Sequence, residues 1–283
     1  MFKLIDGNSI SNNILEELKN KASILNVTGK NRVLVDIFVG DDEASKVYIE
    51  NKKKKFNFVG LKFNQVNLPS NTTEEELIRI IEKYNNDIDT NAIFVELPLP
   101  KHINEKNIID RIDPCKDVDG FGIKCLGSLI QGASSFFPCT AEGIIELLKR
   151  SKIEISGKHC VVIGRSNIVG KPVAILMLNE NSTVTICHSK TKDLKSICKS
   201  ADILIVAIGK PKLIDDSYIK EGAIVIDAGI HRSIVDGKKV ICGDVDFDKV
   251  APHTSYITPV PGGVGPMTVT MLIKHCIDTV NYE

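Results

Sequence analysis

Residues 161–178 read VVIGRSNIVGKPVAILML and contain, in order, a β-branched run, a turn with two glycines and an apolar segment of helical length. Gly164 and Gly170 allow a backbone to approach a ligand closely, and the helix N-terminus offers free N–H groups and a positive dipole end. The spacing is neither G-x-G-x-x-G nor a P-loop, because Val169 and Pro172 stand where a P-loop needs glycine and Ser or Thr. We interpret the stretch as a phosphate-binding strand–turn–helix unit; a tight turn that binds nothing is the alternative.

Outward from this unit, short β-branched runs alternate with helical patterns, which is typical of parallel sheets with crossover helices. The predicted strands are Val33–Val39, Leu61–Val66, Asn91–Glu96, Cys160–Ile163, Thr183–Ile186, Ile203–Val206 and Ala223–Ile226. The predicted helices are Ile10–Ser23, Glu43–Phe58, Thr73–Asn86, Val169–Leu178, Asp193–Lys199, Ser217–Lys220 and Met267–Val280. This alternation predicts the α/β class.

The segment from Asp113 to Thr140 interrupts the alternation, with DPCKDVDGFG and SSFFPCT rich in turn formers. We expect residues 1–139 to form one domain and residues 140–266 a second. The last helix, in residues 267–283, is expected to pack back on the first domain. A cleft between two α/β domains is where a cofactor and a substrate would meet.

The composition excludes several classes of partner. The 283 residues include 36 Lys and Arg and 36 Asp and Glu, so no net field attracts nucleic acid or an acidic membrane. The N-terminus lacks the apolar run of a signal peptide, and no stretch approaches the ~20 apolar residues of a membrane span. The eight cysteines never form C-x-x-C, which favours reduced thiols, a cytoplasmic protein and no metal site.

The strand that follows this phosphate-binding unit, Thr183–Ile186, indicates which nicotinamide dinucleotide binds. In an NAD site an acidic residue normally closes this strand and holds the ribose 2′-hydroxyl. Here TVTIC is followed by His188, Ser189 and Lys190, and Arg165 lies in the phosphate turn. These residues suit a 2′-phosphate, so we expect NADP; solvated surface charges are the alternative.

The segment Glu43–Phe58 places Ser45, Tyr48 and Lys52 on one stripe of a helix. A tyrosine ring can stack on a flat ligand while the lysine one turn away handles protons. The alternative is that Tyr48 is a core residue and that Lys52 belongs to a solvated run of four lysines.

Three further segments carry polar or rigid features. Glu96 ends a predicted strand and so lies at the carboxyl edge of a sheet, where ligands bind in such folds. Asp117 and Asp119 lie in a turn-rich loop, a common place for functional residues. Residues 259–266, PVPGGVGP, are rigid, and their glycines admit a close backbone approach.

Taken together, these segments resemble the bifunctional methylenetetrahydrofolate dehydrogenase/methenyltetrahydrofolate cyclohydrolase family, called FolD in bacteria. The matching stretches follow the family's order along almost the whole chain: VGDDEASKVYIENK, VELPLPKHI, DPCKDVDGF, PCTAEGIIELL, GRSNIVGKP, TVTICHSKT, ADILIVAIGKP, GAIVIDAGI, GDVDF and TPVPGGVGPMT. The resemblance implies a substrate domain in the first half, a Rossmann-type NADP-binding domain in the second, tetrahydrofolate one-carbon substrates and a homodimer.

The resemblance also implies roles for individual residues. Tyr48 would stack along the folate, Lys52 would handle protons in the cyclohydrolase step, and Asp119 would hold the pterin ring. Glu96 would complete the catalytic set. The NADP contacts would be Gly164, Arg165, Ser166, Ser189 and Ile230. Further substrate contacts would be Leu97, Pro261, Gly262 and Gly263.

The chain departs from the family pattern at two positions. The family's VQLPLP is VELPLP here, so Glu96 replaces a glutamine that helps the catalytic lysine, Lys52. The family's PCTP is PCTA here, with Ala141 in place of a proline at the start of a helix. A carboxylate beside Lys52 would favour the ammonium form, which is a poor base, unless Glu96 is itself protonated. Hydride transfer needs mainly the positioning of two ligands, so the dehydrogenase should tolerate Glu96 better than the cyclohydrolase.

The sequence therefore predicts NADP-dependent oxidation of 5,10-methylene-tetrahydrofolate, followed by hydrolysis of the methenyl form to 10-formyl-tetrahydrofolate. We expect Glu96 to weaken this second step. A monofunctional dehydrogenase and a catalytically inactive folate- or nucleotide-binding protein are the alternatives. The intact pair Tyr48 and Lys52 argues against the inactive protein. The loop PVPGGVGP argues against other two-domain dehydrogenases, such as those acting on amino acids or shikimate.

Overall fold

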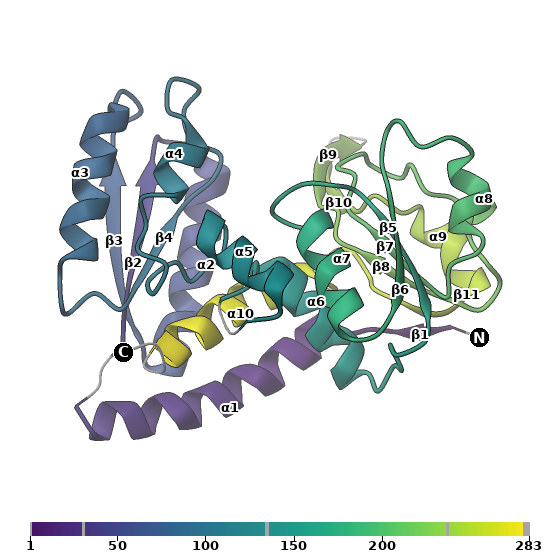
Figure 1. Cartoon of the computed structure of the whole chain (residues 1–283), viewed down its shortest axis with the longest axis horizontal. Helices are drawn as coiled ribbons and strands as arrows, with labels where there is room; N and C mark the ends of the chain where they lie inside the picture. Colours follow the sequence, from purple (N-terminus) through teal and green to yellow (C-terminus); the bar gives the residue numbers. More distant parts are fainter. Residues whose placement is uncertain (1, 30–31, 134–135, 236–237, 280–283) are drawn as a thin grey trace. The chain divides into compact units, whose positions relative to one another are not determined.

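A computed structural model of the chain describes residues 2–29, 32–133, 136–235 and 238–279 (Figure 1). It divides into two compact units. One comprises Met1–Asn12 and Thr140–Thr268, and the other comprises Asn13–Cys139 and Val269–Glu283. The division falls within the helices α1 (Gly7–Val27) and α10 (Gly265–Asp278).

The unit of residues 13–139 is built on a three-stranded parallel sheet in the order β3-β2-β4. Its strands are β2 (Val33–Val39), β3 (Lys62–Leu68) and β4 (Ala92–Val95), and its other helices are α2 (Glu43–Val59), α3 (Glu74–Asn85), α4 (Glu105–Ile109) and α5 (Ile123–Gln131). One face of the sheet presents Ile37 and Ile93 to an apolar core that includes Leu77 and Ile81 of α3. Because side chains alternate along a strand, Asp36 and Phe94 point to the opposite face.

Local sequence signals fix both ends of α2 and the start of α3. Asp42 accepts a hydrogen bond from the backbone N–H of Ser45 at 2.7 Å and begins α2. Gly60, with a φ of 85°, ends α2 in the left-handed conformation that glycine adopts most easily. Thr73 and Glu76 form a reciprocal capping box at the start of α3.

The other unit contains a six-stranded parallel sheet in the order β1-β11-β8-β7-β5-β6. Its strands are β5 (His159–Ile163), β6 (Thr183–Cys187), β7 (Ile203–Val206), β8 (Ala223–Asp227), β11 (Thr254–Ile257) and β1 (Lys3–Leu4). The helices α6 (Cys139–Arg150), α7 (Gly170–Asn179), α8 (Leu194–Cys198) and α9 (Phe247–Val250) accompany them, with a hairpin of β9 (His231–Val235) and β10 (Lys238–Cys242). The strand order reverses between β5 and β7, and such a switch point is where doubly wound sheets bind ligands.

The predicted strands are confirmed within about two residues at each end, and most predicted helices likewise. The helix predicted at Ser217–Lys220 is wrong, because only a short 3-10 helix occurs there, at Asp216–Tyr218. Residues 1–139 do not all belong to one unit, because β1 pairs with β11 and joins Met1–Asn12 to the six-stranded sheet. Val280, the predicted end of the last helix, lies outside the described residues.

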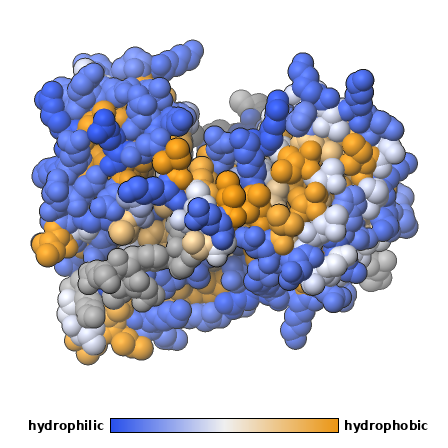
Figure 2. Space-filling model, in the orientation of Figure 1, coloured by the Kyte–Doolittle hydropathy of each residue, from blue (hydrophilic) through white to orange (hydrophobic). Residues whose placement is uncertain are grey.

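We do not predict β1, β11, the hairpin, α4, α5, α6 or α9 from the sequence. β1, α4 and α9 are too short to show a period, whereas α6 is a twelve-residue helix that the sequence interpretation missed. Hydrophilic residues cover most of the face shown in Figure 2, interrupted by separate apolar patches. In the part of the chain that the structure describes, no helix is long and apolar enough to cross a membrane.

Candidate active site

Lys52 on α2 is the most unusual side chain of the unit with the three-stranded sheet. It is fully buried, whereas Lys54, in the same run of lysines, is exposed. Its Nζ lies 2.7 Å from Oδ2 of Asp36 and 2.6 Å from Oε1 of Glu96. A buried ammonium held by two carboxylates is not part of a solvated run of charges.

Asp36 is a member of this cluster that the sequence interpretation missed. It lies in the middle of β2 and is fully buried. Its Oδ1 is buried without a hydrogen-bond partner among the described residues. The available signal was the sequence VLVDIFV, in which one carboxylate interrupts a continuous apolar strand. A charge in such a strand requires a partner, and here the partner is Lys52.

Glu96 follows β4 directly, at the carboxyl end of the sheet, and is 7% exposed. Burial raises the pKa of Glu96 to about 7; Lys52 opposes this increase, and the negative charge of Asp36 adds to it. Two carboxylates share one ammonium, so the second carboxylate is ionised only at a cost. Glu96 therefore takes up a proton near neutral pH, and it resembles the amide of a glutamine below that pH.

Two aromatic rings complete the surroundings of the ammonium. The Nζ of Lys52 lies 3.5 Å from the ring centroid of Phe94 and 5.3 Å from that of Tyr48. Burial, together with the charges of Glu96 and Asp119, raises the pKa of the Tyr48 hydroxyl, which therefore stays protonated. The third residue of the predicted stripe, Ser45, donates its hydroxyl to Asp42 at 2.8 Å at the start of the helix.

The structure separates the two aspartates of the predicted loop. Asp117 is buried and accepts hydrogen bonds from the backbone N–H groups of Gly120 at 3.0 Å and Gly122 at 2.7 Å, so it fixes the loop. Asp119 is half-buried, and burial followed by the charge of Asp117 raises its pKa to about 7. The charges of Lys52 and Glu96 also influence this pKa. Asp119 makes neither of the two loop-fixing bonds of Asp117.

The phosphate turn is built at the carboxyl end of β5 in the other unit. Gly164 has a φ of 137°, and a Cβ there would collide with the carbonyl oxygen of Ala207, the residue after β7. A Cβ at Gly170 would collide with the carbonyl of Gly164. The Ser166 hydroxyl accepts from the N–H groups of Val169 at 3.1 Å and Gly170 at 3.2 Å and so orders the turn that leads into α7. The turn therefore requires glycine at both positions, because neighbouring backbone already fills the space that a side chain would need.

The remaining predicted cofactor contacts lie on exposed positions of this unit. Arg165, Ser189 and Lys190 are exposed, and Ile230 is 61% exposed although it is large and apolar. The backbone N–H of Lys190 donates to Nδ1 of His188 at 3.1 Å, which orders the turn after β6. These side chains are free of the core and can meet a ligand.

The predicted substrate contacts fall in both units. Leu97 follows Glu96 and packs partly against the core beneath the sheet. Pro261, Gly262 and Gly263 belong to the unit with the six-stranded sheet, where the carbonyl of Gly262 accepts from the N–H of Asn8 at 3.1 Å. Within the described ranges, no group of three or more His, Cys, Asp or Glu side chains could hold a metal ion.

Comparison with known proteins gives one consistent family. The model for the tetrahydrofolate dehydrogenase/cyclohydrolase catalytic domain matches residues 5–119, and the model for the corresponding NAD(P)-binding domain matches residues 138–283. The chain is 56% identical over 280 residues to the bifunctional protein FolD of Agathobacter rectalis, covering 99% of each.

Solved structures agree with this result. The bifunctional enzyme FolD from Campylobacter jejuni is 44% identical with a TM-score of 0.96, covering 100% of this chain and 99% of that one. FolD from Trypanosoma brucei, solved with NADP cofactor and an inhibitor, is 37% identical with a TM-score of 0.94, covering 99% of this chain and 98% of that one.

Proposed function

The chain belongs to the tetrahydrofolate dehydrogenase/cyclohydrolase family, and from this premise we propose the reactions and the residues that carry them. It is a bifunctional enzyme that oxidises 5,10-methylene-tetrahydrofolate to the methenyl form with NADP and hydrolyses that form to 10-formyl-tetrahydrofolate. One observation supports the assignment of this chemistry to named residues: the buried Lys52 is bonded to Glu96 and Asp36, and its Nζ lies 5.3 Å from the ring centroid of Tyr48.

In the dehydrogenase step, the protein's contribution is positioning. When bound, NADP supplies a nicotinamide that accepts the hydride, and no base has to act on carbon. The turn of Gly164 and Gly170 suits such a cofactor, because it leads directly into the N-terminus of α7, and a helix N-terminus favours a bound phosphate. The two glycines allow this turn to pack tightly against neighbouring backbone. Tyr48 offers a flat ring for the folate, and Asp119 offers a carboxyl group for the pterin.

In the cyclohydrolase step, the residues near Lys52 control a proton. Water attack on the methenyl carbon requires a base to accept the proton of the water molecule. We assign this role to Lys52, whose Nζ lies 2.7 Å from Asp36 and 2.6 Å from Glu96. Negative charge beside a lysine opposes its action as a base, so hydrolysis is the activity that Glu96 weakens.

NADP rather than NAD is the proposed cofactor in this chain. The support is the basic character around the turn, with Arg165 and Lys190 exposed and no acid after β6. A phosphate group on the ribose would form charge-assisted contacts there, whereas an acidic residue would repel it.

We further propose a homodimer and a cytoplasmic location. Light scattering at several protein concentrations tests the dimer, and a monomer at all of them would contradict it. The location is supported by the eight cysteines, which form no disulfide bond within the described residues and are mostly buried, as expected in a reducing compartment.

The experiment that tests the proposed function is ultraviolet absorbance after mixing the protein, 5,10-methylene-tetrahydrofolate and NADP. Absorbance from NADPH and from methenyl-tetrahydrofolate should grow, and added methenyl-tetrahydrofolate should disappear faster than in buffer. Lys52→Met should lose the hydrolysis, and Lys54→Met is the matched control. A wild type that produces no NADPH would be the inactive binding protein instead.

A further inference from the structure

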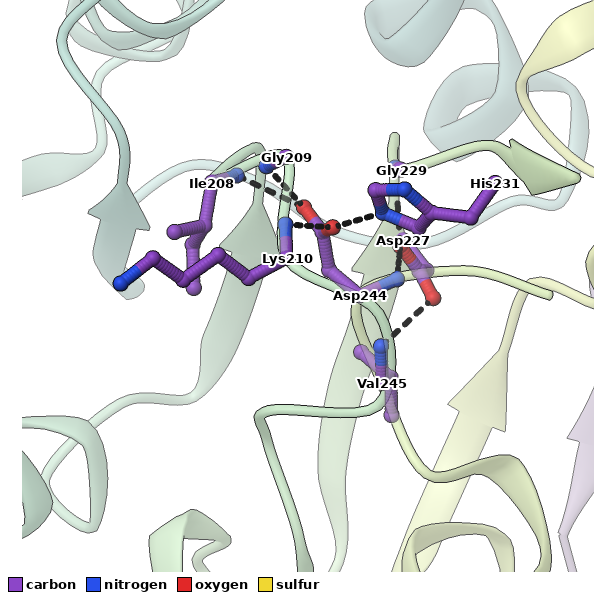
Figure 3. Close-up of polar contacts among 8 residues, drawn as sticks. All are labelled: Ile208, Gly209, Lys210, Asp227, Gly229, His231, Asp244 and Val245. Atoms are coloured by element: carbon purple, nitrogen blue, oxygen red, sulfur yellow. Dashed lines mark hydrogen bonds and ion pairs between the residues drawn. The ribbon is translucent and has the colours of Figure 1, made fainter. Parts of the chain in front are cut away.

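Two buried aspartates outside the cluster around Lys52 form a network of their own. Asp227 ends β8 and is 3% exposed, and Asp244 lies after β10 and is fully buried. Both lie in the unit with the six-stranded sheet. Figure 3 shows the carboxylate of Asp244 facing the segment Ile208–Lys210 and that of Asp227 facing the backbone of Asp244 and Val245.

Asp244 accepts four hydrogen bonds (Figure 3). Its Oδ2 accepts from the backbone N–H groups of Ile208 at 2.7 Å and Gly209 at 3.0 Å. Its Oδ1 accepts from the backbone N–H of Lys210 at 2.8 Å and bonds Nε2 of His231 at 2.7 Å. Successive N–H groups that converge on one carboxylate fix the loop after β7 in a single conformation.

Asp227 holds Asp244 in turn. Its Oδ1 accepts from the N–H groups of Gly229 at 2.9 Å and Asp244 at 3.1 Å, and its Oδ2 accepts from Val245 at 2.9 Å. There is no room for a side chain beside either carboxylate, because a Cβ at Gly229 would meet Asp244 and a Cβ at Gly243 would meet Asp227. The two aspartates are thus one rigid unit built from backbone donors.

This network lies at the edge of the sheet where the dinucleotide turn is. The loop it fixes begins after Ala207, whose carbonyl oxygen packs against Gly164 of the phosphate turn. It also fixes both neighbours of Ile230, because Gly229 is bonded to Asp227 and His231 to Asp244. Ile230 is thereby held in solvent at 61% exposure, which costs free energy unless a ligand covers it.

We infer that Asp244 is a positioning residue for the cofactor: it sets the loop Ile208–Lys210 and the exposed Ile230 in the arrangement that receives the nicotinamide nucleotide. This inference rests on the proposed use of NADP. An aspartate is needed because four donors converge on two oxygens, and an asparagine would turn one acceptor into a donor. Asp244 touches the cofactor only through the segments that it orders.

The test is Asp244→Asn, with Asp248→Asn as the matched control, since Asp248 is exposed on the neighbouring α9. Calorimetric titration with NADP alone should give a Kd about tenfold higher in Asp244→Asn, the effect of losing bonds to a charged acceptor. The kcat at saturating NADP and the KM for 5,10-methylene-tetrahydrofolate should stay within about twofold of wild type, and Asp248→Asn should match wild type throughout.

His231→Ala gives a second measurement that does not depend on the folding of Asp244→Asn. It removes one of the four donors at a partly exposed side chain, so the Kd for NADP should rise about threefold while the KM for folate stays constant. An unchanged Kd in both variants would overturn the inference, as would equal losses in the Kd for NADP and the KM for folate. A wild type that does not bind NADP would instead overturn the proposed function.

Discussion

Replacing Glu96 by glutamine keeps the shape of the side chain beside Lys52 but removes one of two carboxylates from a buried ammonium. The charge of Glu96 depends on pH, because burial raises its pKa from the ordinary 4.5 to about 7. Glu96→Gln should therefore resemble wild type at pH 6, where Glu96 is mostly protonated, and differ from it at pH 8.

The same difference gives the magnitude for stability. A carboxyl group whose pKa is higher in the folded state binds its proton more tightly there, so wild type loses stability as the pH rises from 4.5 to about 7 and loses no more above it. At ~1.4 kcal/mol for each tenfold change in proton affinity, this loss is about 3 kcal/mol. Glu96→Gln avoids this loss. The free energy of unfolding by urea should therefore be higher in the variant, relative to wild type, at pH 8 than at pH 5.

For activity, the difference between the two enzymes is the charge that Glu96 carries beside the Nζ of Lys52 above about pH 7. A charge worth ~1.4 kcal/mol to the proton-transfer step changes its rate tenfold. We expect methenyl hydrolysis at pH 8 to rise by up to about tenfold in Glu96→Gln, with the two enzymes converging at pH 6. The dehydrogenase rate should move less than about twofold, because hydride transfer does not use that proton.

Both activities are followed by absorbance from pH 6 to pH 9. Glu50→Gln is the control, since Glu50 is exposed on the same helix. A hydrolysis ratio between variant and wild type that is flat across this range would refute the ion-pair reasoning. A variant slower than wild type at pH 8 would show instead that Glu96 is the base.

Three further outcomes follow from the same geometry. Asp36→Asn combined with Glu96→Gln leaves Lys52 without a carboxylate, so hydrolysis at pH 8 should exceed that of Glu96→Gln alone, and an equal rate would show that Asp36 does not control the lysine. Lys52→Met should abolish methenyl hydrolysis, while Lys54→Met should stay near wild type. Equal activity in the two variants would show that Lys52 has no special role in the hydrolysis. The kcat/KM should favour NADP over NAD, and Arg165→Ala should weaken NADP binding by ~1.5–3 kcal/mol with little effect on NAD; equal loss for both cofactors would remove Arg165 from the 2′-phosphate site.

The sequence by itself determined the strands and helices whose hydropathy pattern is clear. Residues Cys160–Ile163 of β5 and all of β7 are continuous apolar runs, as expected for a buried parallel sheet, and the helix α2 has its own capping residues at each end. The ordered motifs determined the family, because many weak patterns in a fixed order are far more specific than any one of them. The turn of Gly164 was readable because glycine spacing reports directly on backbone approach.

The tertiary structure alone decided which charges meet. Asp36 and Lys52 are on neighbouring elements with no spacing rule between them, and β2 and β4 bring Asp36 and Glu96 to one ammonium only after the sheet pairs. Asp117 and Asp119 look equivalent in sequence, and only the folded loop makes Asp117 the acceptor of the N–H groups of Gly120 and Gly122. Local sequence encodes backbone preference and hydrophobic period, whereas the protonation of a buried carboxylate depends on burial and on neighbours distant in the chain, which exist only in the folded protein.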